Sequence, residues 1–461
     1  MINYFNFKKF NNEYLITNDF GKYQFISFDT VKKLVNGNEN IDDSVLTPLK
    51  DNFFIIDESR QAYLDKCTPY MRAAKKHLFQ STGLFIFVMT NSCNLNCIYC
   101  QAQSETSKQK GMMTKEIAKK GVDIALQSPT SSITIEFQGG EPLLNFEIIK
   151  YIIEYSSSIN TNKIISYNLV SNLSLLTDEI ADYLSEHKVQ VSVSLDGPAF
   201  VHNKNRPFRI GGGSYDAAMQ GIELLKSRDI NLGAIQTTTK YSLPHAKDII
   251  DAYLKLGFNS IFIRPLTQLG YASEHWNEIG YTSDEFLIFY KESLEYIINL
   301  NTDDIVFSEG HASILLTKIL QGYSNNYMEL RSPCGATIGQ IAIYYDGNIY
   351  TCDEGRMVAE MGDSAFKLGD VFSCNYDDLI DSGVCKTVCA ASCLETIPSC
   401  CDCVYQPYCG VCPVINYAID NDLYARVGNN RCKIYSGILD FLFTIINETP
   451  DKVCILKRWI E

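Results

Sequence analysis

The feature that most constrains the fold of this chain is a sixfold alternation of short apolar runs with helical patterns, between Leu84 and Arg264. The apolar runs predict strands at 84–89, 132–137, 165–170, 190–195, 231–237 and 260–264. Segments between them, such as 177–187 and 215–226, carry apolar residues three and four positions apart, as amphipathic helices do. This alternation predicts parallel strands joined by right-handed crossovers, in a barrel or an open sheet. In either architecture the functional site lies at the carboxyl ends of the strands.

A smaller unit precedes the alternation. Alternating and apolar runs predict strands at 13–17, 23–26 and 53–56, and helical patterns predict helices at about 29–36 and 42–49. A connecting helix is expected at about 60–79. After Asn299 the alternation stops, and a cysteine-rich third begins.

Cysteine usage points to metal. The chain of 461 residues has 17 cysteines, and 12 of them fall between Cys334 and Cys432. No secretory signal opens the sequence, and no apolar stretch approaches the roughly 18 residues that span a membrane. We therefore expect a cytoplasmic protein with no membrane partner, in a reducing compartment where dense cysteines bind metal more often than they form disulfides. The net charge of −14 argues against nucleic acid as a partner.

The decisive motif follows the first strand of the alternation. Its three cysteines, Cys93, Cys97 and Cys100, are separated by three and then two residues. Three thiolates in a loop at the end of a strand can bind three irons of a cubane cluster and leave the fourth iron open for a ligand. The alternative is a zinc site, but structural zinc prefers four closed ligands, and no fourth Cys or His lies nearby in sequence.

This spacing, with the aromatic Tyr99 before its last cysteine, resembles the radical S-adenosylmethionine (radical SAM) superfamily. The segment Gln138–Leu143 is similar to the glycine-rich segment that receives the methionine amino group in that family. The resemblance implies that the three cysteines bind a 4Fe–4S cluster and that S-adenosylmethionine is bound by Tyr99, Gly139, Gly140, Glu141, Pro142, Ser171, Asn172, Ser194 and Arg206. Within this set, Arg206 would hold the cofactor carboxylate through its planar fork.

The cysteine-rich third resembles the SPASM extension of these enzymes, which carries two auxiliary 4Fe–4S clusters. By that resemblance Cys334, Cys352 and Cys412 bind the first auxiliary cluster, and Cys400, Cys403, Cys409 and Cys432 bind the second. The spacing departs from the family at one point, because two residues rather than three separate Cys409 from Cys412. The first set lacks a ligand, so either its iron is open or one of Cys374, Cys385, Cys389 and Cys393 completes it. A pair of zinc ribbons is the alternative reading of this region.

The resemblance also implies an overall organisation. It predicts an α/β chain with a winged-helix-like peptide-recognition domain at 1–60, a linker helix at 61–82, a partial (β/α)6 TIM barrel at 83–325 and a SPASM domain at 326–461. Short phrases such as Ile263–Leu266 and Tyr405–Gly410 are similar to the maturase of His-Xaa-Ser peptide systems. The first domain would bind a leader segment by adding it as a strand. Asp353, which follows a cluster ligand, matches the general base of related sulfatase-maturing enzymes, and its alternative is a turn carboxylate.

The function expected from this resemblance is oxidative maturation of a ribosomally made precursor peptide. A flavodoxin or ferredoxin would supply electrons, S-adenosylmethionine would yield a 5′-deoxyadenosyl radical, and the product would be a crosslink. Two alternatives remain: a sulfatase-type maturase that forms formylglycine, and a non-catalytic iron–sulfur or zinc scaffold or electron carrier. The peptide, the modified residue and the oligomeric state are not determined by the sequence.

Overall fold

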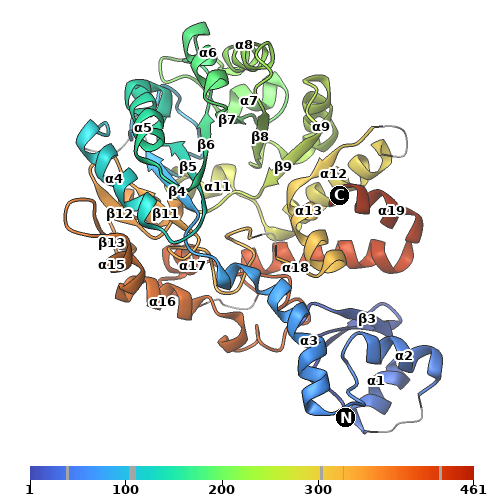
Figure 1. Cartoon of the computed structure of the whole chain (residues 1–461). Helices are drawn as coiled ribbons and strands as arrows, with labels where there is room; N and C mark the ends of the chain where they lie inside the picture. The colour runs from blue at the N-terminus through green and yellow to red at the C-terminus, as the bar shows by residue number, and fades with distance from the viewer. Residues whose placement is uncertain (38–40, 103–110, 302–304, 325, 425–427) are drawn as a thin grey trace.

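The computed structural model describes residues 1–37, 41–102, 111–301, 305–324, 326–424 and 428–461. Its centre is a ten-stranded sheet with the order β10-β9-β8-β7-β6-β5-β4-β11-β12-β13 (Figure 1). The strands are β4 (Leu84–Val88), β5 (Ser132–Gln138), β6 (Ile164–Ser171), β7 (Gln190–Ser194), β8 (Leu232–Thr237), β9 (Ser260–Arg264), β10 (Ser308–Glu309), β11 (Gln340–Ile343), β12 (Asn348–Tyr350) and β13 (Lys367–Asp370). Strands β4 to β9 are parallel and adjacent in chain order, which confirms the partial α/β barrel.

Helices cover the outer face of the barrel. Side chains along each strand alternate between the two faces of the sheet, so one set lies under the helices and the other faces the interior of the barrel. In β5, Ile135 and Phe137 are fully buried, whereas Glu136 and Gln138 line interior cavities. The helices of this part are α4 (Lys115–Gln127), α5 (Phe146–Ile159), α6 (Asp178–Glu186), α7 (Ala199–Asn205), α8 (Tyr215–Lys226), α9 (Ala246–Lys255), α10 (Tyr271–Glu274), α11 (Trp276–Ile279), α12 (Ser283–Leu300) and α13 (Gly310–Leu316). Short 3-10 or π turns are η2 (Pro142–Asn145), η3 (Leu243–His245) and η4 (Thr317–Gln321).

The N-terminal unit is a three-stranded antiparallel sheet followed by helices. It contains β1 (Asn6–Phe10), β2 (Glu13–Thr17), β3 (Tyr23–Ile26), α1 (Phe28–Val35), α2 (Asp43–Asp51), α3 (Arg60–Ala74) and η1 (Lys76–Phe79). The strand predicted at 53–56 is wrong. Phe53 has a φ of 64° in a turn, and only Ile55 pairs, with Ile2. Both Phe53 and Phe54 are buried, so this apolar run reflects packing of a turn, and the third strand is β1.

The cysteine-rich region joins the barrel through its sheet. Its helices are α14 (Asp353–Glu360), α15 (Tyr376–Asp381), α16 (Gly383–Ala391), η5 (Leu394–Thr396), α17 (Pro413–Asp420), α18 (Asn430–Glu448) and α19 (Pro450–Arg458). Because β11 pairs in parallel with β4, the sheet runs across the domain limit predicted between residues 325 and 326. Residue 325 itself lies outside the described residues, and the three limits between the four predicted domains remain predictions.

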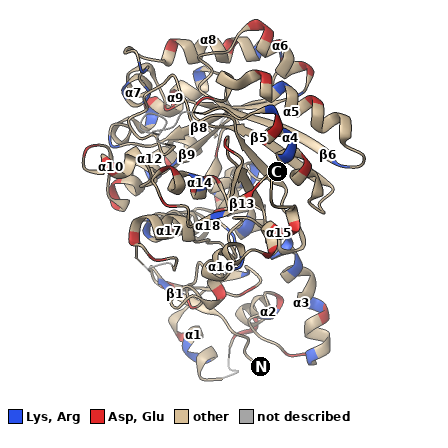
Figure 2. Cartoon of the chain, turned by 90° about the vertical axis from the view of Figure 1, so that its left-hand side faces the viewer, with Lys and Arg blue, Asp and Glu red and all other residues tan. Residues whose placement is uncertain are grey.

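The N-terminal unit packs on the cysteine-rich region. The side-chain amide of Asn6 donates to the carbonyls of Cys401 and Cys403 at 3.0 and 3.1 Å. The Thr17 hydroxyl donates to the carbonyl of Val404 at 2.7 Å. Asn6 and Thr17 are buried. The unit lies below the barrel, and Lys, Arg, Asp and Glu are interspersed over the outer helices (Figure 2). Within the described parts of the chain, no helix combines the length and the apolarity that crossing a membrane requires.

Candidate active site

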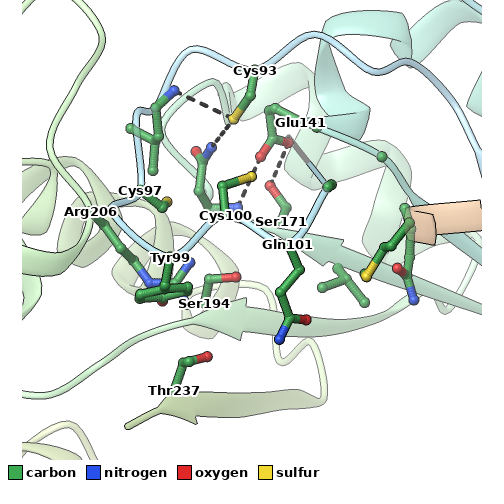
Figure 3. A pocket seen from close by; sticks show the side chains of 18 of the residues that line it. Cys93, Cys97, Tyr99, Cys100, Gln101, Glu141, Ser171, Ser194, Arg206 and Thr237 are labelled. Carbon is green, nitrogen blue, oxygen red and sulfur yellow. Dashed lines mark hydrogen bonds between the residues drawn. The ribbon is translucent and has the colours of Figure 1, made fainter. Parts of the chain in front are cut away.

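The three-cysteine loop lies at the carboxyl end of β4, beside a cavity of about 230 Å³ (Figure 3). Cys93, Cys97 and Cys100 all line this cavity. The loop is fixed by backbone hydrogen bonds to the end of α7 and the turn after it, since the Ile98 amide donates to the Asn205 carbonyl at 3.0 Å and the Asn96 amide to the Pro207 carbonyl at 2.8 Å. The structure therefore brings the three predicted cluster ligands together at one site.

Gly139 and Gly140 hold the turn after β5 against the cysteine loop. The Gly140 amide donates to the Thr90 carbonyl and the Glu141 amide to the Ser92 carbonyl, both at 2.8 Å. A Cβ on Gly140 would lie 2.1 Å from the Ser92 carbonyl oxygen, and one on Gly139 would lie 2.5 Å from that of Thr90. No side chain larger than hydrogen fits at either position. The two glycines thus serve close packing of the cysteine loop, besides lining the cavity.

Glu141 joins three loops from inside the protein. Its side chain is 1% exposed and accepts hydrogen bonds from the Leu143 amide at 3.1 Å, the Ser171 hydroxyl at 2.8 Å and the Asn172 amide at 3.0 Å. Burial raises the pKa of Glu141 to about 6, while these hydrogen bonds act in the opposite direction. These contacts show that the carboxylate fixes the loops around the cavity.

Asp196 is a buried partner of two predicted cofactor-binding residues. Its carboxylate is fully buried and accepts from the Tyr99 hydroxyl at 2.7 Å, from Nη2 of Arg206 at 3.1 Å and from the Thr237 amide at 3.2 Å. Burial is the largest single influence on Arg206 and opposes its charge, but Asp196 and the other groups around the guanidinium together raise the pKa of Arg206. The guanidinium also lies over the Tyr99 ring, 5.2 Å from its centroid. Sequence reasoning missed Asp196, although its position directly after β7 could have indicated it.

The remaining predicted residues divide into two groups. Ser171, Asn172 and Ser194 line the cavity at the ends of β6 and β7. Pro142 does not line it; it is the buried first residue of η2. Further residues that line the cavity were not predicted, and these are Leu95, Gln101, Ala102, Gln138, Val170, Thr237, Arg356 and Met357.

The donor set fits an iron–sulfur cluster with an open iron. Burial, with the nearby charge of Glu141, raises the pKa of Cys93 to about 12, and burial also raises the pKa of Cys97. Free thiols here would therefore be protonated, and a bound cationic centre would hold them as thiolates. Beside them the cavity leaves room for a small-molecule ligand, as an open iron requires.

A second interior cavity, of about 590 Å³, adjoins the first. Gln138 and Val170 line both cavities. Asp353, the predicted general base, lines the second cavity from the first turn of α14. Its carboxylate accepts from Arg356 Nε at 2.8 Å, and Arg356 reaches the first cavity. The Asp353–Arg356 pair thus lies where the two cavities meet.

The four cysteines predicted for the second auxiliary cluster also come together. Cys400, Cys403, Cys409 and Cys432 line one cavity of about 70 Å³, and their thiols interact electrostatically. The three predicted for the first auxiliary cluster, Cys334, Cys352 and Cys412, share one buried cluster. In the described part of the chain, no three His, Cys, Asp or Glu side chains are grouped to hold a single metal ion.

The chain has a partial parallel barrel with three cysteines beside a cavity at the ends of its strands. This combination defines a class of enzymes, those with an iron–sulfur cluster that keeps one iron open to a ligand. Comparison with protein families matches residues 87–241 to the radical SAM superfamily. An uncharacterized protein of Methanocaldococcus jannaschii is 30% identical over 250 residues, which are 52% of this chain and 86% of that protein. A cysteine-type anaerobic sulfatase-maturating enzyme of Clostridium perfringens is 27% identical over 285 residues, 59% of this chain and 74% of that enzyme.

Two solved structures share the fold. One, of anSMEcpe with bound AdoMet, has a TM-score of 0.70 at 21% identity and covers 82% of this chain and 98% of that one. Another, of Streptococcus suis SuiB bound to precursor peptide SuiA, has a TM-score of 0.57 at 14% identity and covers 93% of this chain and 98% of that one.

The chain belongs to the radical SAM superfamily, and it is an enzyme of the kind that uses a 4Fe–4S cluster and S-adenosylmethionine. This decides against the non-catalytic scaffold. When bound, the cluster supplies an electron and S-adenosylmethionine supplies the 5′-deoxyadenosyl radical that abstracts hydrogen from a substrate.

Proposed function

We propose that the chain is a peptide maturase that takes a hydrogen atom from a ribosomally made precursor peptide and leaves the peptide oxidised, as in a crosslink. The observation that carries this proposal is the second cavity, which borders the cofactor cavity at Gln138 and Val170. A peptide side chain in this cavity would lie next to the place where S-adenosylmethionine is expected. Positioning of this kind is the main contribution that a protein makes to radical chemistry.

Asp353 is proposed to accept a proton from the peptide. It lines the cavity proposed for the substrate, and Arg356 orients its carboxylate from the side of the cofactor cavity. Two further carboxylates of this cavity, Glu136 and Glu354, have pKa values that burial raises. Several acidic groups line this cavity, and Asp353 is proposed as the base because it lies where the two cavities meet.

Peptide recognition is proposed for the N-terminal unit. β3 is an edge strand, and a cavity of about 530 Å³ runs along Tyr23, Gln24 and Phe25 toward Ile319 and Ile446. An extended leader segment could add to this edge through backbone hydrogen bonds. The SuiB structure with precursor peptide SuiA, which covers 93% of this chain, supports a peptide as the partner.

Three clusters and an external reductant complete the proposal. Ten cysteines gather at three places, in numbers that suit one cluster with an open iron and two auxiliary clusters. A flavodoxin or ferredoxin is proposed as the electron donor. The His-Xaa-Ser peptide systems are proposed as the branch, on the phrases of sequence described above.

A second candidate is a sulfatase-type maturase that forms formylglycine from Ser or Cys. The 27% identity to the cysteine-type anaerobic sulfatase-maturating enzyme of Clostridium perfringens favours it. The two candidates differ in substrate and in product, so one mass-spectrometric experiment separates them.

The test begins with anaerobic reconstitution, from which about twelve irons per chain are expected for three cubane clusters. Dithionite and S-adenosylmethionine should then yield 5′-deoxyadenosine. Cys97→Ala should abolish this product because it removes a ligand of the catalytic cluster. Cys454→Ala, at an exposed cysteine with no assigned role, is the matched control and should retain it.

The product is then identified by mass spectrometry of a co-expressed precursor peptide and, separately, of a sulfatase peptide. Loss of two hydrogens from the precursor peptide supports a crosslinking maturase. Formylglycine in the sulfatase peptide alone would replace that proposal with the second candidate. Activity in Cys97→Ala would reject the assignment of the catalytic cluster.

A further inference from the structure

The first auxiliary site has three gathered thiols and lacks a fourth ligand. Cys334 precedes β11, Cys352 is the N-cap of α14 and Cys412 is the N-cap of α17. All three are at most 5% exposed and belong to one buried cluster with apolar residues. A cubane cluster has four irons, so a site of three thiolates leaves one iron without a protein ligand.

Helix α16 packs directly against these thiols. Val388 in its last turn belongs to the same buried cluster. Its C-cap, Ser392, is fully buried and tied to Cys334, because the Cys334 amide donates to the Ser392 hydroxyl at 3.0 Å. The same hydroxyl donates to the Val388 carbonyl at 2.7 Å. The end of α16 is thereby held beside Cys334.

Among the four candidate cysteines, the thiol of Cys389 faces the site. It interacts electrostatically with the thiol of Cys334 and with the Arg331 guanidinium. Cys385 lies one turn earlier, farther from the Ser392 end of the helix that is tied to Cys334. Cys385 and Cys389 are four residues apart in α16, so both thiols lie on one face of the helix.

The other two candidates are engaged elsewhere. Cys374 packs against Gly369 of β13, and its sulfur lies 3.6 Å from the Ser373 hydroxyl. The Cys393 thiol donates to the Glu395 carboxylate at 3.3 Å.

Arg331 gives a separate indication of an anionic group at this place. Its side chain is 2% exposed and interacts with the thiols of both Cys334 and Cys389. Its Nη2 atom is buried and has no hydrogen-bond partner. A buried guanidinium with a free donor is unfavourable unless negative charge lies beside it. A cubane cluster with four thiolate ligands is an anion and would supply that charge.

We infer that Cys389 is the fourth protein ligand of the first auxiliary 4Fe–4S cluster, which is then bound by Cys334, Cys352, Cys389 and Cys412. The inference rests on the auxiliary clusters of the proposed function. It excludes an open iron at this cluster, so substrate does not bind there, and the catalytic cluster is the one with an exchangeable position.

The test uses a full-length chain in which Cys93, Cys97 and Cys100 are replaced by alanine, so that iron and electron paramagnetic resonance report the auxiliary clusters alone. We expect about eight irons per chain in this background. Cyanide, which binds an open iron, should leave its reduced spectrum unchanged. Adding Cys389→Ala should lower the iron to about four, or give a spectrum that cyanide shifts. Adding Cys374→Ala or Cys393→Ala instead should change neither quantity.

Cys389→Ser provides a variant of nearly the same size, in case alanine disturbs folding. It should keep its helix content by circular dichroism and still alter the spectrum, because oxygen replaces sulfur at the iron. If Cys389→Ala and Cys389→Ser both kept eight irons per chain and an unchanged spectrum, this inference would be overturned while the proposed function stood. A cyanide shift while Cys389 is present would also overturn it. A background chain without iron would overturn the auxiliary clusters of the proposed function as well.

Discussion

Replacing Glu141 by glutamine tests how the cofactor cavity is held together. The carboxylate accepts the Leu143 amide and the Ser171 hydroxyl on Oε1 and the Asn172 amide on Oε2. Glutamine has the same shape, but one of its two terminal atoms is an amino group that only donates. The hydroxyl of Ser171 can rotate, whereas a backbone amide cannot. In the variant, one of the two amides therefore faces another donor.

The size of the effect follows from burial. A buried donor left without an acceptor costs about 1–3 kcal/mol, and about 1.4 kcal/mol corresponds to a factor of ten. Local opening should become roughly 5 to 150 times more frequent at one of the two amides. Global stability should change less, because neutral glutamine is easier to bury than a carboxylate whose pKa burial raises to about 6.

Hydrogen exchange at pH 7, resolved to single amides by nuclear magnetic resonance, measures this directly. Faster exchange is expected at Asn172, or at Leu143 if the glutamine amide is turned over, with the other amide near its wild-type rate. Glu116→Gln, at an exposed glutamate in the first turn of α4, is the control and should alter neither amide. Wild-type protection at both amides in the Glu141 variant would refute the reasoning.

Two further predictions concern packing and pH. Gly140→Ala should lower the iron bound at the catalytic cluster and destabilise the loop by about 1–3 kcal/mol, because the added Cβ meets the Ser92 carbonyl. Gly383→Ala, which has open space around the added Cβ, is the control and should bind iron normally. Equal iron in the two variants would contradict the packing argument. Burial lowers the pKa of His311 to about 4, so in acid the unfolded chain binds more protons than the folded one. The stability of the fold therefore decreases as the pH is lowered. Between pH 7.5 and pH 5 the free energy of unfolding should decrease by about 2 kcal/mol because of His311. Over this range the calorimetric melting temperature should fall less in His311→Gln than in the wild type. Parallel curves of melting temperature against pH would refute this expectation.

Much of the barrel could be predicted because its information is local. The runs at 132–137 and 260–264 match β5 and β9 to within one residue, since apolar side chains at alternating positions mark a strand with one face packed against helices. The pairing of β11 with β4 could not be predicted in this way. These strands are far apart in the chain, and periodicity carries no information on which distant strand completes an edge.

The site shows the same division. Cysteine spacing identified Cys93, Cys97 and Cys100, which line one cavity because ligands close in sequence are close in space. The auxiliary groups, whose members are far apart in sequence, came from the family resemblance. Asp196 was missed since its role depends on Tyr99 and Arg206, which reach it from other loops. Gly140 was assigned to cofactor binding, and its contact with the Ser92 carbonyl, which depends on two strands being adjacent, was not foreseen.

The hydrogen bonds from Asn6 and Thr17 to the loop of Cys401, Cys403 and Val404 have a practical consequence for dissecting this enzyme. Deleting the N-terminal unit to test for leader dependence would also remove three donors from carbonyls in a loop that holds two proposed cluster ligands. Lost activity in such a truncation would therefore not separate peptide recognition from damage to the cluster. Point substitutions on the β3 edge, away from these contacts, separate the two effects.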